Sequence, residues 1–152
     1  MTTGVHSIEF VVRRRPGLKV DEIVPILDGR SLLDLIDRFE IDSGMKPAGG
    51  AYGGLIPAYL RHKSFDEHFL GAPFPGLSPK TAVLSCECGE VGCWPLMTRI
   101  IPTGSLVVWD AFEQIYRETR DYTKFGPFLF DRTQYDQALQ ALCAQITTTE
   151  DP

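Results

Sequence analysis

Residues Thr81–Trp109 read TAVLSCECGEVGCWPLMTRIIPTGSLVVW, and this stretch decides the fold. Over Thr81–Cys88 alternate side chains fall on opposite faces, which is typical of a β-strand. Gly89–Gly92 holds two glycines that suit a hairpin turn, and Thr103-Gly104 suits a second turn. The stretch therefore predicts a meander of three antiparallel strands, with the middle strand over Cys93–Ile101.

The regions on either side alternate between strand and helix patterns. Apolar and polar side chains alternate over Ile8–Arg13, and a second strand is expected over Leu18–Leu27, where Pro25 favours an edge or a bulge. Asp28-Gly29 breaks this run. Ser31 then precedes a helical stripe, and Asp34 completes a capping box. The stripe consists of Leu32, Leu35, Ile36 and Phe39.

The remaining elements are expected to be mostly helical. Capping signals predict a short helix over Ser64–Gly71 and another that begins at Asp110 with Glu113. A short strand is expected at Phe128–Phe130, followed by a long helix capped by Asp131 with Gln134. The apolar stripe of that helix is Tyr135, Ala138, Leu139, Leu142 and Ile146, and residues 147–152 are expected to form a frayed tail.

These patterns predict an α+β fold, a single domain over residues 1–152 with a mostly antiparallel sheet and helices packed on one face. A hydrophobic content of 43% with 23% charged residues is typical of a folded protein. The net charge of −5 argues against general affinity for nucleic acid or anionic membranes. Arg13–Arg15 is the one basic run, and we interpret it as the solvated end of a strand.

The chain carries no apolar run of about eighteen residues, so no membrane span is expected. Its first residues, MTTGVHSIEF, lack the pattern of a secretion signal. We therefore expect a cytoplasmic protein whose thiols are kept reduced.

Three of the four cysteines fall within eight residues, at the first turn of the meander. Cys86 and Cys88 are two apart on one strand, so both side chains project from the same face. If Gly89–Gly92 is a four-residue loop, Cys93 faces Cys88 with β-carbons about 4.5–5.5 Å apart. The hairpin is thus expected to bring three sulfur atoms together.

One hypothesis for this hairpin is a zinc site. Thiolates are good zinc ligands, and a structural site requires four ligands. The set would be Cys86, Cys88 and Cys93 with His62 as the fourth ligand. Cys143 and His68 are the alternatives for that fourth position.

Two other interpretations remain open. CGEVGCW is similar to the surroundings of papain-type cysteines, but all three histidines precede Cys86, the reverse of the papain order. Glu87 and Glu90 would raise a neighbouring thiol pKa, which disfavours a reactive thiolate. The third interpretation is that the cysteines are small buried residues, with Trp94 packed over them.

The segment SGMKPAGGAYGGL places four glycines around Ala51 and Tyr52. No Lys-Ser or Lys-Thr follows at P-loop spacing, so it is not a phosphate-binding loop of that type. We expect a flexible surface connection, or a mobile flap over a site. Tyr52 in this loop and Trp94 beside the hairpin are the candidate binding residues.

The hairpin CECGEVGCWPL, together with Val108-Trp109, Phe130-Asp131 and Tyr135, resembles a group of uncharacterised small bacterial proteins. They share a C-x-C-G-E-x-G-C centre and a C-terminal helix. The resemblance covers roughly the second half of the chain. It implies a bacterial cytosolic origin but no particular activity, cofactor or functional residue.

The small size, the excess of acidic residues and the lack of a recognisable catalytic set favour a non-enzymatic protein, acting as a protein-binding or regulatory module. The alternative is a zinc- or thiol-dependent enzyme. Its site would lie between the cysteine hairpin and the Gly49–Gly54 loop.

Overall fold

The computed structural model of the chain describes residues 5–15, 20–46, 49, 52–57, 65–71, 80–86, 95–114, 117 and 119–150. Its elements in chain order are β1 (Val5–His6), β2 (Ile8–Arg14), β3 (Asp21–Leu27), β4 (Arg30–Ser31), α1 (Leu32–Asp42), β5 (Tyr52–Gly53), α2 (Phe65–Phe69), β6 (Thr81–Cys86), β7 (Leu96–Pro102), β8 (Leu106–Glu113), β9 (Phe128–Asp131) and α3 (Arg132–Glu150). Within these residues, no helix has the length and apolar character needed to span a membrane.

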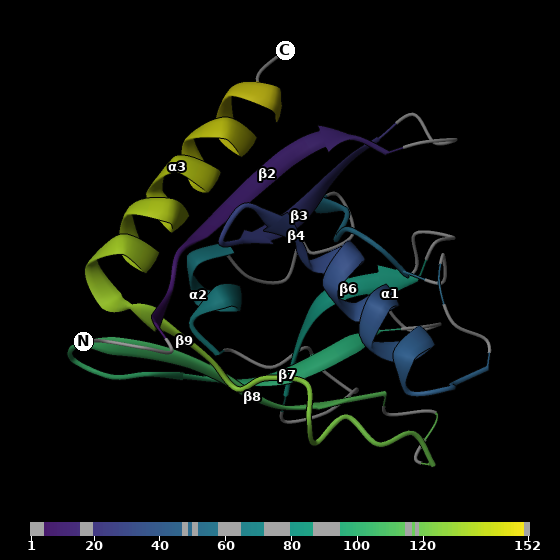
Figure 1. Cartoon of the computed structure of the whole chain (residues 1–152). Helices are drawn as coiled ribbons and strands as arrows, with labels where there is room; N and C mark the ends of the chain where they lie inside the picture. Colours follow the sequence, from purple (N-terminus) through teal and green to yellow (C-terminus); the bar gives the residue numbers. More distant parts are fainter. Residues whose placement is uncertain are drawn as a thin grey trace.

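The strands form two sheets. The larger has the order β1-β9-β8-β7-β6-β5, and the smaller has the order β2-β3-β4. All pairs are antiparallel except β1 with β9. Figure 1 shows α3 running along β2, with β7 and β8 toward the bottom of the view and β9 leading directly into the start of α3. The prediction of an α+β fold with a mostly antiparallel sheet is confirmed, as is the meander β6-β7-β8.

The N-terminal strand passes from one sheet to the other at Ser7. β1 pairs with β9 in the larger sheet, and β2 begins one residue later in the smaller sheet. The Asp28 carboxylate holds this crossing point, because Oδ1 accepts from the Ser7 amide at 2.8 Å and Oδ2 lies 2.6 Å from Nδ1 of His6. The hydrogen bond with His6 lowers the pKa of Asp28. Asp28 and Gly29 both have positive φ, which suits the tight turn between β3 and β4.

Pro25 lies within β3, opposite Phe10 of β2. The amide of Ile23 donates to Leu55 and therefore faces away from β2. Because backbone groups alternate along a strand, the nitrogen of Pro25 faces the same way. On that side β3 pairs with Leu55 at Ile23 and with β4 from Ile26 onward. Pro25 lies between these two pairings, so its missing N–H group removes no hydrogen bond from either.

One hydrophobic cluster spans both sheets and the helices between them. The predicted stripe of α3 is buried throughout, and Nε1 of Trp109 donates to the Tyr135 hydroxyl at 3.1 Å. Phe10 of β2 contacts both Tyr135 and Phe69 of α2 through its ring. The smaller sheet is therefore joined to the larger one by aromatic packing around α3.

One expected element was wrong. Asp110 and Glu113 do not begin a helix, because residues 106–113 form β8. Asp110 instead forms a bidentate pair with Arg99 of β7, with both N–O distances at 2.8 Å. The helix α3 continues to Glu150, and the fraying of residues 147–152 remains a prediction.

Candidate functional site

Tyr52 and Cys86, two of the residues singled out from the sequence, are direct partners across β5 and β6. The expected surface loop was wrong for this region, since Tyr52 to Ile56 are buried and Tyr52–Gly53 is a strand. Close packing explains why Gly53 and Gly54 are glycines. A β-carbon at Gly53 would overlap the guanidinium of Arg15, and one at Gly54 would collide with the backbone of Ile23.

Arg15 was expected to be solvated with its neighbours Arg13 and Arg14, but only 4% of it is exposed. Its Nη1 lies 3.3 Å from Oε1 of the buried Glu22, and its Nη2 donates to the Cys86 carbonyl at 2.8 Å. The same Glu22 oxygen accepts from the Gly54 amide at 2.8 Å. This buried ion pair therefore links the smaller sheet to β5 and β6. Because the pair is buried and hydrogen-bonded to the backbone at Gly54 and Cys86, we assign it a structural role.

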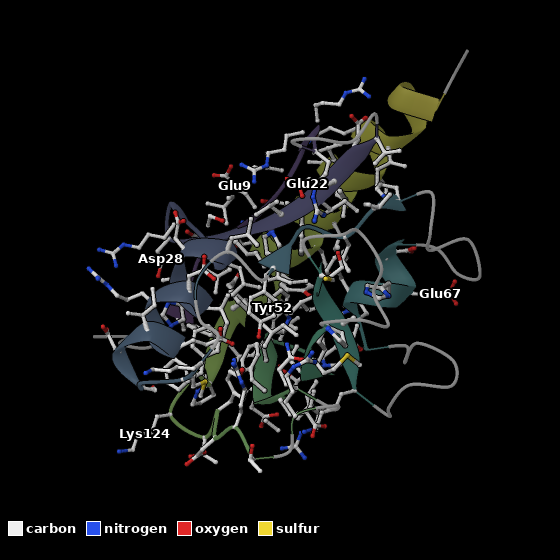
Figure 2. The ribbon with its side chains drawn as sticks, turned by 90° about the vertical axis from the view of Figure 1, so that its right-hand side faces the viewer. Glu9, Glu22, Asp28, Tyr52, Glu67 and Lys124 are labelled. Carbon is white, nitrogen blue, oxygen red and sulfur yellow. The ribbon has the colours of Figure 1, made fainter. Side chains whose placement is uncertain are left out.

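The hydroxyl of Tyr52 belongs to a second buried polar cluster. It donates to Oε2 of Glu40 at 2.6 Å and accepts from Nε2 of Gln114 at 2.7 Å. The hydroxyl of Tyr122 donates to the same Glu40 oxygen at 2.6 Å. Figure 2 shows Tyr52 in the interior of the molecule. We name these residues, together with Arg120, the Glu40 cluster.

Arg120 supplies the positive charge of the Glu40 cluster. Its Nη1 lies 3.2 Å from Oε2 of Glu40, with the two side chains 8% and 0% exposed. Burial raises the pKa of Tyr52 strongly, and the Glu40 carboxylate raises it further. Burial also raises the pKa of Tyr122. At neutral pH both phenols are therefore protonated donors to Glu40.

Arg120 also faces a cavity of about 520 Å³, between the C-terminal end of α1 and the segment that follows residue 118. Its apolar wall is Phe39 and Met45. Figure 2 shows Lys124 extending outward near the end of α1. The other described lining residues are Gly44 and a set of polar or charged residues: Ser43, Lys46, Thr119, Asp121 and Lys124. The cavity is thus a candidate binding site whose inner wall is fixed by the Glu40 cluster.

The predicted zinc ligands are only partly within the described residues. Cys88, Cys93, His62 and the candidate binding residue Trp94 lie outside them. Among the residues that the structure describes, no group of three or more His, Cys, Asp or Glu side chains could hold a metal ion. The convergence of sulfur atoms at the hairpin remains a prediction.

The two alternatives for the fourth ligand are described. His68 is buried in α2, and its Nε2 lies 2.7 Å from the Ala82 carbonyl. Ala82 is four residues from Cys86 along β6, a distance of about 13 Å at 3.3 Å per residue. Cys143 is half-buried on α3, where burial and the Asp66 carboxylate raise the pKa of its thiol. The structure therefore pairs Cys86 with Tyr52. His68 instead lies next to Ala82, at the far end of β6 from Cys86.

The Glu40 cluster was missed from the sequence, although one signal for it was present. Leu32, Ile36 and Glu40 are spaced four apart and form the buried face of α1. A glutamate on an apolar stripe is unusual and implies a buried partner. The partners could not be read in the same way, because Tyr122 and Arg120 lie about eighty residues away in a segment without periodic pattern.

Comparisons with known proteins do not extend this description: no protein-family model, curated protein or solved structure matches the chain.

Proposed function

We propose that the chain is a non-enzymatic protein of the bacterial cytoplasm, a protein-binding or regulatory module whose partner contacts the cavity beside Arg120. The observation that carries this proposal is the double role of Arg120. It lines the cavity and forms an ion pair with the buried carboxylate of Glu40, 3.2 Å away. A side chain fixed in this way loses little conformational entropy when a partner binds.

The raised pKa values of two phenols in the Glu40 cluster and of the Cys143 thiol on α3 support a binding role over a catalytic one. Tyr52 and Tyr122 have raised pKa values, so neither is poised to exchange a proton near neutral pH. The pKa of the Cys143 thiol is also raised, which disfavours the thiolate needed for nucleophilic chemistry. These shifts move each group away from reactivity.

The proposal can be tested with a photo-crosslinking amino acid at position 42, exposed at the end of α1 next to the cavity. Position 137, exposed on the outer face of α3, is the matched control. We expect one discrete adduct with a bacterial lysate protein from position 42 and none from position 137. Excess unlabelled wild-type chain should suppress that adduct. Equal labelling from both positions, or none from either, would contradict a partner site at the cavity.

A second candidate function is a zinc- or thiol-dependent enzyme, which the pairing of Tyr52 with Cys86 favours. This pairing places the glycine-rich segment beside the strand that leads into the cysteine hairpin. Metal analysis of the full chain purified without chelator, with a thiol titration, separates the two functions. One zinc per chain, or one fast-reacting thiol, would favour the enzyme. Four ordinary thiols without metal would favour the binding module.

A further inference from the structure

Within the described part of the chain, the lysines that have no carboxylate partner both line the cavity beside Arg120. Lys80 is paired with Glu113 at 2.9 Å, whereas Lys46 and Lys124 form no ion pair with a described residue. Two unpaired ammonium groups beside a buried guanidinium are unexpected on a chain with a net charge of −5. From this convergence we infer that the cavity is an oxyanion site, which binds a carboxylate or phosphate group carried by the ligand. This inference rests on the proposed function, because it specifies the chemistry of the same cavity.

The end of α1 does not account for these lysines. Cations often satisfy the last carbonyl groups of a helix. Here backbone amides already do so, because the Phe39, Ile41 and Glu40 carbonyls accept from Ser43, Gly44 and Met45 at 3.0 Å each. The lysine ammonium groups are therefore not required as caps of α1.

Asp121, the one carboxylate among the described residues of the lining, does not account for them either. Its Oδ1 accepts from the Thr123 amide at 2.9 Å and from the Thr123 hydroxyl at 2.7 Å. These hydrogen bonds lower the pKa of Asp121, with a smaller contribution from the Lys124 charge. Neither lysine approaches Asp121 within ion-pair distance. Arg120 is already paired with Glu40 at 3.2 Å, so among the described lining residues two unpaired lysines remain with one carboxylate, and that carboxylate is bonded within its own turn.

The lining also limits the ligand. Ammonium groups act as point charges on oxyanions, while the hydroxyl groups of Ser43 and Thr119 can donate hydrogen bonds. Phe39 and Met45 offer an apolar surface in the same cavity. A volume of about 520 Å³ is within the range of small-molecule sites. The ligand group is therefore an oxyanion next to an apolar or aromatic body, either on a free organic acid or at the end of a partner chain.

The probes for the experiment are benzoate, its neutral analogue benzamide, and inorganic phosphate. Each is titrated into the full chain at constant ionic strength and followed by backbone amide NMR. We expect saturable shifts for benzoate and phosphate that are confined to residues 43–46 and 119–124, and none for benzamide. In the Lys46→Gln/Lys124→Gln double variant, the dissociation constant should rise at least tenfold. Lys80→Gln, the matched control, should bind as the wild type does.

Two further arms distinguish the source of the oxyanion. A short peptide ending in phenylalanine is titrated with a free C-terminal carboxylate and with an amidated terminus. Tighter binding of the free peptide than of benzoate points to a partner chain, and tighter binding of benzoate points to a free acid.

The inference is overturned if shifts are non-saturable and spread over the surface, or if Lys80→Gln weakens binding as much as the double variant does. A crosslinked partner that the double variant still binds would overturn the oxyanion site and leave the proposed function standing. Oxyanion binding with no crosslinked partner would support the oxyanion site and contradict the proposed protein-binding function.

Discussion

The hydroxyl groups of Tyr52 and Tyr122 lie 3.4 Å apart, and each donates at 2.6 Å to the same oxygen of Glu40. The Arg120 guanidinium forms an ion pair with that oxygen at 3.2 Å. A buried carboxylate is costly unless charge and hydrogen bonds compensate it. Here both act on Oε2, whereas Oε1 has no hydrogen-bond partner among the described residues. The wall of the candidate cavity therefore depends on one buried carboxylate.

The raised tyrosine pKa values predict a loss of stability in alkaline solution. In the unfolded chain Tyr52, Tyr122 and Tyr135 lose their protons near the ordinary value of 10.0, whereas in the native chain burial keeps them protonated. Above pH 10 the unfolded state therefore binds fewer protons, and the free energy of unfolding falls as pH rises. Below that pH the stabilisation is fully present.

Urea unfolding between pH 8 and pH 11 measures this effect. In Tyr52→Phe the fall above pH 10 should be shallower by up to about 1.4 kcal/mol per pH unit, the value for one proton. Ultraviolet absorbance should show at least three of the five tyrosines resisting ionisation until the chain unfolds. Normal titration of all five in the folded protein would contradict the burial of these phenols.

Arg120→Met should destabilise the chain by about 3–5 kcal/mol, because it leaves the Glu40 carboxylate buried without its cation. Adding Glu40→Gln removes that charge and keeps an oxygen that accepts from Tyr52 and Tyr122. We expect the double variant to unfold at higher urea concentration than Arg120→Met alone. Losses that simply add in the double variant would show that Glu40 and Arg120 do not interact.

Gly53→Ala tests the packing of the glycine-rich segment. A β-carbon there would overlap the Arg15 guanidinium, so the variant must displace part of the buried pair with Glu22. We expect a loss of at least about 1–3 kcal/mol, the usual cost of overpacking. Gly104→Ala is the matched control, because no atom lies within 4 Å of a β-carbon there. Equal unfolding midpoints for the two variants would refute this account of Gly53.

The strands and helices that the sequence predicts correctly are those with a local period. The alternation in Ile8–Arg13, the stripe of α3 and the turn at Asp28-Gly29 all depend on residues close together in the chain. Asp110 and Glu113 have the spacing of a capping box, but the strand pairing of β7 with β8 prevails over that local signal.

The candidate site was largely beyond prediction for a related reason. Four glycines near Tyr52 indicate flexibility when considered alone. In the structure Gly53 and Gly54 are small because Arg15 and the backbone of Ile23 approach closely, from segments about thirty or forty residues away. Arg15 itself was assigned to a solvated basic run, since nothing local distinguishes it from Arg13 and Arg14. Contacts between distant segments decide each of these positions.

Gln134 gives a case in which local and tertiary arguments predict opposite signs. It is the third residue of α3, where a glutamate would interact favourably with the helix dipole and could complete a capping box with Asp131. The Gln134 amide does donate to Asp131 at 3.0 Å, as the sequence predicts. Its side chain, however, pairs with β2: Oε1 accepts from the Ile8 amide at 2.9 Å and Nε2 donates to the Ile8 carbonyl at 2.7 Å.

Gln134→Glu retains the acceptor, loses the donor, and places a carboxylate oxygen against the Ile8 carbonyl. We therefore expect the folded chain to lose about 1–3 kcal/mol of unfolding free energy at neutral pH. An isolated α3 peptide with the same change should keep or gain helicity by circular dichroism. Gln137→Glu, exposed one turn further along α3, should leave the chain nearly unchanged. If Gln134→Glu stabilises the whole chain, the dipole outweighs the contact with β2, and α3 is not anchored to that strand through Gln134.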